Sequence, residues 1–132
     1  MATKEQVSTL LYFKWEEFHH PELCDMDFLR WLDVVRLYAR VPLILTSDAR
    51  TPAENAAAGG SPTSLHLLGR AVDLHWNFSK EQLFKLLDAV CDAGQGRGVE
   101  LEVVPTGPQA HVHIGLFPDA LHPSSFFVGT SA

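Results

Sequence analysis

The sequence has 132 residues, of which 46% are hydrophobic and 20% are charged. This is the composition of a folded globular protein and argues against disorder, so we expect one domain over residues 1–132. Acidic residues number 16 and basic residues 10, which gives a net charge of -6. A chain with this balance is not expected to bind nucleic acid or an anionic membrane surface non-specifically.

The sequence shows no targeting or membrane signal. No apolar stretch approaches the roughly 20 residues that a membrane-spanning helix needs. Lys4 and Glu5 are followed by no continuous apolar segment, so the N-terminus does not resemble a signal peptide. We therefore expect the protein to be cytoplasmic at synthesis, and we expect Cys24 and Cys91 to be reduced and packed rather than bridged.

Hydrophobic periodicity and capping signals predict helices alternating with short strands. In chain order the sequence predicts a helix over about 26–40, a buried strand over 41–45, a helix from 52 to 58, a strand over 70–76, a helix over about 79–93, and strands near 99–104 and 110–115. The last two strands are joined by a loop rich in proline and glycine and should form a β-hairpin. We therefore expect an α+β fold with a small, mostly antiparallel sheet and helices packed on one of its faces.

Histidines gather in the predicted strand region. Four of the seven lie there: His66, His75, His111 and His113. Because side chains alternate along a strand, Asp73 shares a face with His75, and His111 shares a face with His113. Zinc accepts imidazole and carboxylate ligands, and a metal would satisfy polar groups that are costly to bury unpaired. Spacing alone leaves a second reading open, in which these are ordinary surface or core residues.

A longer motif surrounds the first of these histidines. It consists of T-S-D-A-R-T-P at 46–52, Asn55, Gly59-Gly60 and the pattern S-x-H-x-x-G-x-A-x-D at 64–73, with F-K-W-E-E-F at 13–18 upstream and H-V-H at 111–113 downstream. In this combination the sequence resembles the zinc D-Ala-D-Ala peptidase family, which has the hedgehog/DD-peptidase fold. Gly69, inside the pattern, indicates a close approach of the backbone between two of the matched positions.

The resemblance implies a zinc peptidase that cleaves peptidoglycan stem peptides, either as a DD-carboxypeptidase or as an endopeptidase. It implies one zinc ion per chain, held by His66, Asp73 and His113, with a fourth position left open as in catalytic zinc sites. It also implies that Arg50 binds a carboxylate or carbonyl of the substrate, and that Ser64 orients the substrate or the loop carrying the first ligand. The alternatives are a solvated surface arginine and a simple turn serine.

The sequence departs from the family pattern at Ala110, where an acidic residue is usual three positions before the last ligand. Alanine cannot accept a proton, so an active enzyme needs a different group as general base, and the alternative is that catalysis has been lost. His111 is one candidate. Glu102 is the other, because a hairpin register that gathers the apolar residues of both strands on one face places Glu100 and Glu102 on the face of His113; a slip of one residue would reverse this.

Two functions of different classes follow from these observations. The first is an active peptidase, encoded by a bacteriophage for lysis or carried in the virion, which acts in the periplasm or cell wall after release. The second, favoured by Ala110, is an inactive zinc-binding module of the same fold that contacts other phage particle proteins. A metal-free binding domain would require the match at all three ligand positions to be coincidental.

Overall fold

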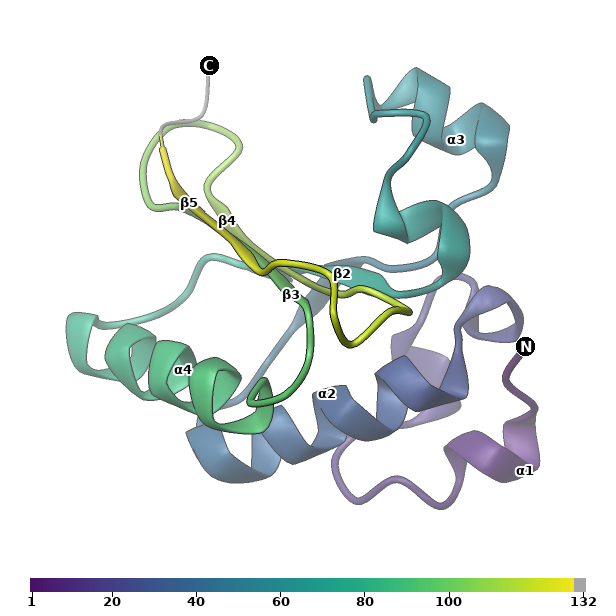
Figure 1. Ribbon diagram of the computed structural model, residues 1–132, viewed down its shortest axis with the longest axis horizontal. Helices are drawn as coiled ribbons and strands as arrows, with labels where there is room; N and C mark the ends of the chain where they lie inside the picture. Colours follow the sequence, from purple (N-terminus) through teal and green to yellow (C-terminus); the bar gives the residue numbers. More distant parts are fainter. Residues whose placement is uncertain (130–132) are drawn as a thin grey trace.

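The computed structural model describes residues 1–129 and consists of one mixed sheet with helices on both sides of it (Figure 1). The helices are α1 (Lys4–Val7), α2 (Met26–Ala39), α3 (Pro52–Ala57) and α4 (Lys80–Ala93), with 3-10 turns η1 (Trp15–Glu17), η2 (Pro21–Leu23) and η3 (Leu65–Leu68). The strands are β1 (Leu45–Ser47), β2 (Ala71–His75), β3 (Val99–Val104), β4 (His111–Leu116) and β5 (Ser125–Val128). Their order in the sheet is β1-β2-β4-β3-β5, and neighbours are antiparallel except for the parallel pair β3 and β5.

The hydrophobic core lies between the sheet and the pair α2 and α4, which pack side by side on one face. Phe28, Leu32 and Val35 of α2 and Leu86 and Val90 of α4 are completely buried. Burial of each such side chain contributes about 1.5–3 kcal/mol relative to exposure. The arrangement confirms the expected α+β fold with a mostly antiparallel sheet. The short helix α3 stands on the other side of the sheet (Figure 1), so the helices do not all pack on one face as expected.

The helix boundaries follow the capping signals in the sequence. Asp25 caps α2 by accepting a hydrogen bond from the backbone N–H of Phe28. The side chain of Thr51 caps α3 and Pro52 occupies its first turn. Ser79 forms the expected capping box at the start of α4. These short polar side chains satisfy backbone donors that have no partner inside the helix, which is why the predicted starts are accurate.

The strand predicted over 41–45 is wrong, because β1 begins only at Leu45. Val41 and Leu43 are 3% and 5% exposed, which accounts for the apolar signal in the sequence. Pro42 lacks the N–H that a strand pairing requires, and pairing with β2 starts at Leu45. Val41 and Leu43 therefore pack into the core ahead of the strand, while Ile44 between them and the strand is 48% exposed.

Two features of the structure depart from the sequence expectations elsewhere. β5, at the edge of the sheet, was not predicted, because Phe126, Phe127 and Val128 are all exposed and show no alternation. Both cysteines are free. Burial raises the pKa of the Cys24 thiol to about 12, whereas Cys91 is exposed, so the expectation of packing is wrong for Cys91.

No helix within residues 1–129 combines the length and the apolar character that crossing a membrane requires.

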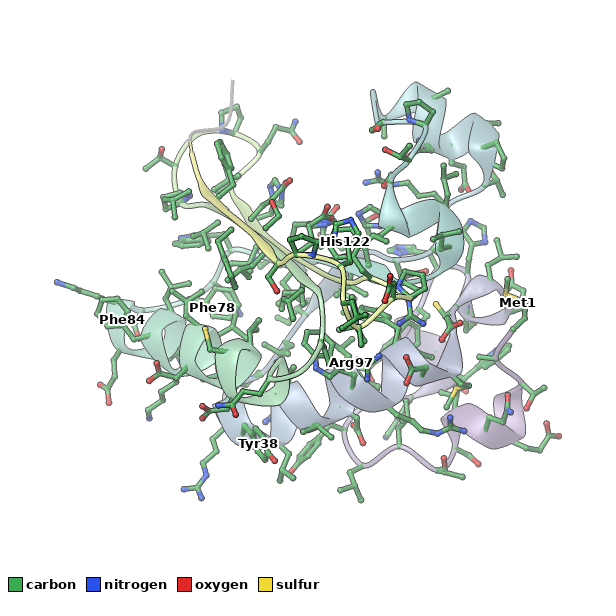
Figure 2. The ribbon with its side chains drawn as sticks, viewed as in Figure 1. Met1, Tyr38, Phe78, Phe84, Arg97 and His122 are labelled. Atoms are coloured by element: carbon green, nitrogen blue, oxygen red, sulfur yellow. The ribbon has the colours of Figure 1, made fainter. Side chains whose placement is uncertain are left out.

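A buried arginine ties the start of β2 to α2. Arg70 is 5% exposed, and its guanidinium donates to Asp25 Oδ1 at 2.9 Å, to Asp27 Oδ2 at 3.0 Å and through Nε to the carbonyl of Leu116 at 2.8 Å. Arg97, labelled in Figure 2, adds a second contact to Asp27 at 2.6 Å. These contacts hold the pKa of Asp27 below its usual range, although partial burial of the carboxyl acts against the shift. Two acidic side chains near the start of one helix are thereby paired with arginines that lie just before β2 and β3.

We predict that Arg70→Leu lowers the free energy of unfolding by about 1–3 kcal/mol, because it removes one donor from the Leu116 carbonyl and from each of two carboxylates, of which Asp27 keeps its contact with Arg97. The upper end of the range for buried ion pairs is not expected, since both aspartates are 40% or more exposed and can be rehydrated. Urea unfolding followed by circular dichroism measures the change. Arg30→Leu, at an exposed position of α2, is the matched control and should change stability by less than about 0.5 kcal/mol.

Candidate metal centre and active site

A cavity of about 930 Å³ opens on the face of the sheet that α2 and α4 leave uncovered. Alternation along β4 produces this division: Val112 and Ile114 are fully buried in the core, while His111 and His113 line the cavity. β2 contributes Asp73, and the turn η3 contributes His66. Polar side chains from separate elements therefore meet on one surface.

The three residues that the family motif marks as ligands converge at the floor of this cavity. Asp73 and His113 are direct partners in the antiparallel pairing of β2 with β4, so they emerge side by side. Asp73 Oδ1 lies 2.9 Å from His113 Nδ1 and 3.4 Å from His66 Nε2. The two imidazole rings meet edge to face with centroids 5.1 Å apart. One potential ligand atom from each residue lies within 4.8 Å of the other two.

The turn η3 places His66 over the end of β2. Ser64 caps this turn, and its Oγ accepts a hydrogen bond from the backbone N–H of His66 at 3.2 Å. Gly69 ends the turn with φ of +67°, a left-handed conformation that favours glycine. A Cβ at this position would collide with the carbonyl oxygen of Leu23. The close backbone approach expected at Gly69 is confirmed, and it sets where η3 turns into β2.

Burial and charge together determine the ionisation of the cluster. Burial disfavours the charge of Asp73, but hydrogen bonds and attraction from His113 and His66 outweigh it and hold the pKa of Asp73 well below its usual range. Burial likewise opposes protonation of His113, yet its contacts with Asp73 and Glu100 raise the pKa of His113 to about 9. Asp73 is therefore a carboxylate at neutral pH, as a metal ligand must be.

Neighbouring groups occupy the atoms of the cluster that point away from its centre. His66 Nδ1 lies 2.7 Å from the backbone carbonyl oxygen of Asp48 and can only donate to it, so Nε2 is the nitrogen that faces Asp73. Arg50 Nη2 donates to Asp73 Oδ2 at 3.3 Å, so Oδ1 is the oxygen that faces the imidazoles. Such outer contacts orient metal ligands in proteins.

Asp48 is a further positioning residue for which the sequence analysis assigned no role. Its side chain is fully buried and accepts hydrogen bonds from the backbone N–H groups of His19 and His20, at 2.8 and 2.9 Å. Its carbonyl holds His66. The signal was present, because Asp48 belongs to the motif at 46–52, but nothing in spacing alone links it to residues 19 and 20.

The hairpin register agrees with the hydrophobic argument. Leu101 pairs with Ile114, and Glu102 pairs with His113, so both glutamates of β3 line the cavity. The acid that contacts the cluster is nevertheless Glu100, whose Oε1 lies 2.5 Å from His113 Nε2. This hydrogen bond lowers the pKa of Glu100, against the effect of its partial burial. The sequence placed Glu100 on this face without giving it a role.

The remaining candidate residues surround the same cavity. Arg50, Ser64, Ala110 and His111 all belong to its lining, and Arg50 is 20% exposed rather than a solvated surface side chain. His111 Nδ1 donates to the carbonyl of Gln109 at 2.6 Å, which leaves Nε2 as the acceptor of a neutral ring. His75, although paired with His111 across the sheet, is exposed and lies outside the lining.

The donor set fits a zinc ion. Two imidazole nitrogens and one carboxylate oxygen are the ligand types found in catalytic zinc sites, where three protein ligands leave one position open. Each ligand has its second polar atom occupied by an outer contact, and the cluster faces an open cavity rather than the core. A structural zinc site would instead be closed by a fourth protein ligand, whereas the group of mutually close ligand atoms found within residues 1–129 comprises His66, Asp73 and His113 alone.

Comparisons with known proteins agree with this geometry. The family model described as Peptidase M15 matches residues 11–114. Among solved structures, the L-Ala D-Glu endopeptidase ChiX of Serratia marcescens has a similar fold, with a TM-score of 0.53 and 23% sequence identity. The similarity covers 83% of this chain and 92% of that chain. No curated protein matches the chain.

We predict that Gly69→Ala destabilises the protein by about 2 kcal/mol more than Gly59→Ala does. Both glycines have positive φ, +67° and +72°, so alanine adds about 1 kcal/mol of backbone strain at either position. Only at Gly69 does the new Cβ also meet a neighbouring backbone, a collision of the kind that costs about 1–3 kcal/mol, whereas Gly59 has open space around it. Urea unfolding of the two variants separates the cost of backbone strain from the cost of the collision. Equal losses of unfolding free energy in the two variants would contradict the close backbone approach at η3.

Proposed function

Because the chain belongs to the Peptidase M15 family, we propose that it is a zinc-dependent peptidase that cleaves peptidoglycan stem peptides. The observation that carries the proposal is the convergence of His66, Asp73 and His113 at the floor of a cavity of about 930 Å³. A zinc ion held by these residues would polarise the scissile carbonyl and make water nucleophilic near neutral pH. The proposed place of action is the bacterial cell wall, where such peptides occur.

The bond that is cut belongs to the same proposal. The Serratia protein of similar fold is named as an L-Ala D-Glu endopeptidase, which supports endopeptidase activity. The motif at 64–73 supports the D-Ala-D-Ala specificity of the resembling family equally well. Product analysis distinguishes the two, because a carboxypeptidase releases free D-Ala and an endopeptidase releases a longer fragment. A bacteriophage origin stays a prediction from sequence.

Arg50 and Ser64 are the proposed substrate-binding residues. The Arg50 guanidinium has five donors, and one of them holds Asp73 Oδ2 at 3.3 Å. The group also lines the cavity, where its planar fork suits a substrate carboxylate or carbonyl. In this proposal Arg50 both orients a ligand and clamps the substrate. Ser64 likewise caps the turn of His66 and faces the same cavity.

Glu102 and His111 are the two proposed general bases. Glu102 stands opposite His113 on β3 and lines the cavity, so its carboxylate can accept a proton from the attacking water. His111 presents a free Nε2 because its Nδ1–H is bound to the carbonyl of Gln109. Glu100 is not proposed for this role, because its carboxylate is already bound to His113.

A second candidate function rests on Ala110. This residue lines the cavity at the position where the resembling family has an acid, so the chain holds no carboxylate there. In that case the protein binds zinc without hydrolysis and serves as a structural or interaction module, for instance in a phage particle. The presence of Arg50, Ser64 and His111 around the cavity favours the enzyme, because a structural zinc site has no use for them.

We predict one zinc ion per chain, lost in His113→Ala because two remaining ligands hold the metal weakly. Elemental analysis of protein purified without chelator measures the content. His75→Ala is the matched control: it removes an imidazole from the neighbouring strand, but from outside the cavity, and should retain full occupancy. Full zinc occupancy in His113→Ala would show that the metal lies elsewhere.

We predict that the wild-type protein cleaves purified stem peptides and that Glu102→Gln or His111→Ala lowers the rate on the order of a hundredfold or more. Zinc content should be unchanged in the variant that loses activity. Liquid chromatography with mass spectrometry of the products measures the rate and identifies the bond. With a base already present, Ala110→Asp should add little.

Two results would contradict this account of the base. An active wild type that tolerates both Glu102→Gln and His111→Ala would exclude both residues. A silent wild type that binds zinc fully would favour the structural module, and recovery of hydrolysis in Ala110→Asp would then identify the missing acid as the cause.

A further inference from the structure

Glu100 reaches His113 across the sheet because the register leaves room for it. Glu100 on β3 is the direct partner of Gly115 on β4, and His113 is the diagonal neighbour two residues before that glycine. A Cβ at Gly115 would lie 3.4 Å from Glu100 Oε1 and would collide with the side chain of Leu65. The Glu100 carboxylate thus lies within contact distance of position 115 on its way to His113, while the space that requires a glycine there is the space taken by Leu65.

The ring of His113 is held at both of its nitrogens. Nδ1 lies 2.9 Å from Asp73 Oδ1, and Nε2 lies 2.5 Å from Glu100 Oε1. An ionised carboxylate can only accept, so Nε2 donates a hydrogen to Glu100 and Nδ1 donates one to Asp73. Nδ1 is the nitrogen that faces the other two ligand residues, and its proton would be displaced by a bound metal. The His113 side chain is 9% exposed and the Glu100 side chain 25%, so water competes little for this hydrogen bond.

Glu102 provides the contrast within the same strand. It pairs directly with His113 and lies on the same face as Glu100, yet the hydrogen bond to the imidazole comes from Glu100. Glu100 in turn contacts the nitrogen of His113 that points away from Asp73, and it is not part of the group of mutually close ligand atoms. Its place in the site is that of an outer partner rather than a ligand.

We propose that Glu100 is a positioning residue of the metal centre, which fixes the orientation of His113 through the Nε2–H hydrogen bond and thereby presents Nδ1 to the metal. This inference rests on the proposed zinc site. It matches the roles of Asp48 toward His66 and of Arg50 toward Asp73, so that each ligand has an outer partner, two of them from the loop between β1 and α3 and one from β3. Loss of such a partner lowers metal affinity by about 10–100-fold in other zinc proteins.

The test compares zinc affinity in four proteins: wild type, Glu100→Ala, Glu100→Gln and Glu102→Gln. Competition with a chromophoric chelator gives the dissociation constant. We expect Glu100→Ala to weaken zinc binding about 10–100-fold, and Glu100→Gln to weaken it less, because the amide oxygen still accepts from Nε2–H. Glu102→Gln removes the same charge from the same face of β3 without touching the hydrogen bond, and we expect an affinity within about twofold of wild type.

A spectroscopic measurement separates positioning from a general structural effect. In the zinc-loaded wild type, nitrogen NMR of the histidine side chains should show His113 protonated at Nε2, and this signal should change in Glu100→Ala but not in Glu102→Gln. Urea unfolding of the chelator-treated proteins shows whether Glu100→Ala still folds, and Glu100→Gln, being nearly isosteric, carries the test if it does not.

Each outcome bears on one proposal. Zinc binding by Glu100→Ala equal to that of wild type would overturn the positioning role alone. An equal loss in Glu100→Gln and Glu102→Gln would also overturn it, because the effect would then come from charge and not from the contact. A wild type that binds no zinc would overturn the proposed zinc site itself.

Discussion

The site depends on the pairing of β2 with β4, which sets the Asp73 carboxylate against the His113 imidazole at 2.9 Å. A buried carboxylate is costly without partners, and here His113, His66 and Arg50 supply them from three other elements. Because a shift of one residue between the strands would turn Asp73 into the core, the same register that packs Val72 and Leu74 also assembles the cluster. The register of β2 and β4 therefore determines the packing of the core and the geometry of the site together.

The second layer of contacts ties the site to the rest of the molecule. Asp48 is fixed by backbone donors from residues 19 and 20 and holds His66 with its own carbonyl. Arg70 anchors the start of β2 to α2, three residues before Asp73. Gly69 allows η3 to pass close to the backbone at Leu23. Each of these contacts lies outside the cavity, yet each limits how far the side chain of His66 or Asp73 can move.

The floor and the rim of the cavity differ in how closely they follow the family pattern. At the floor, the three residues that the motif marks as ligands are all present and lie close together. At the rim, Ala110 replaces an acid while Glu102 and His111 stand near enough to line the same space. A general base has to lie within hydrogen-bond reach of the proton it takes, but it need not come from one fixed position in the chain. The two candidate functions, hydrolysis with a base at a different position and zinc binding without hydrolysis, therefore differ in whether a residue at this rim accepts the proton.

The sequence by itself determined the helices of the core, the cap of α4 and the faces of β2, β3 and β4, because these depend on periodicity and on side chains a few residues apart. It also predicted the three residues that converge at the cavity, since His66, Asp73 and His113 stand in a specific motif. Only the tertiary structure decided that Glu100 rather than Glu102 holds His113, and that Asp48 holds His66. Strand alternation gives the face on which a side chain lies, but the reach of a glutamate along a diagonal to the next strand depends on atoms that become neighbours only after the sheet has formed.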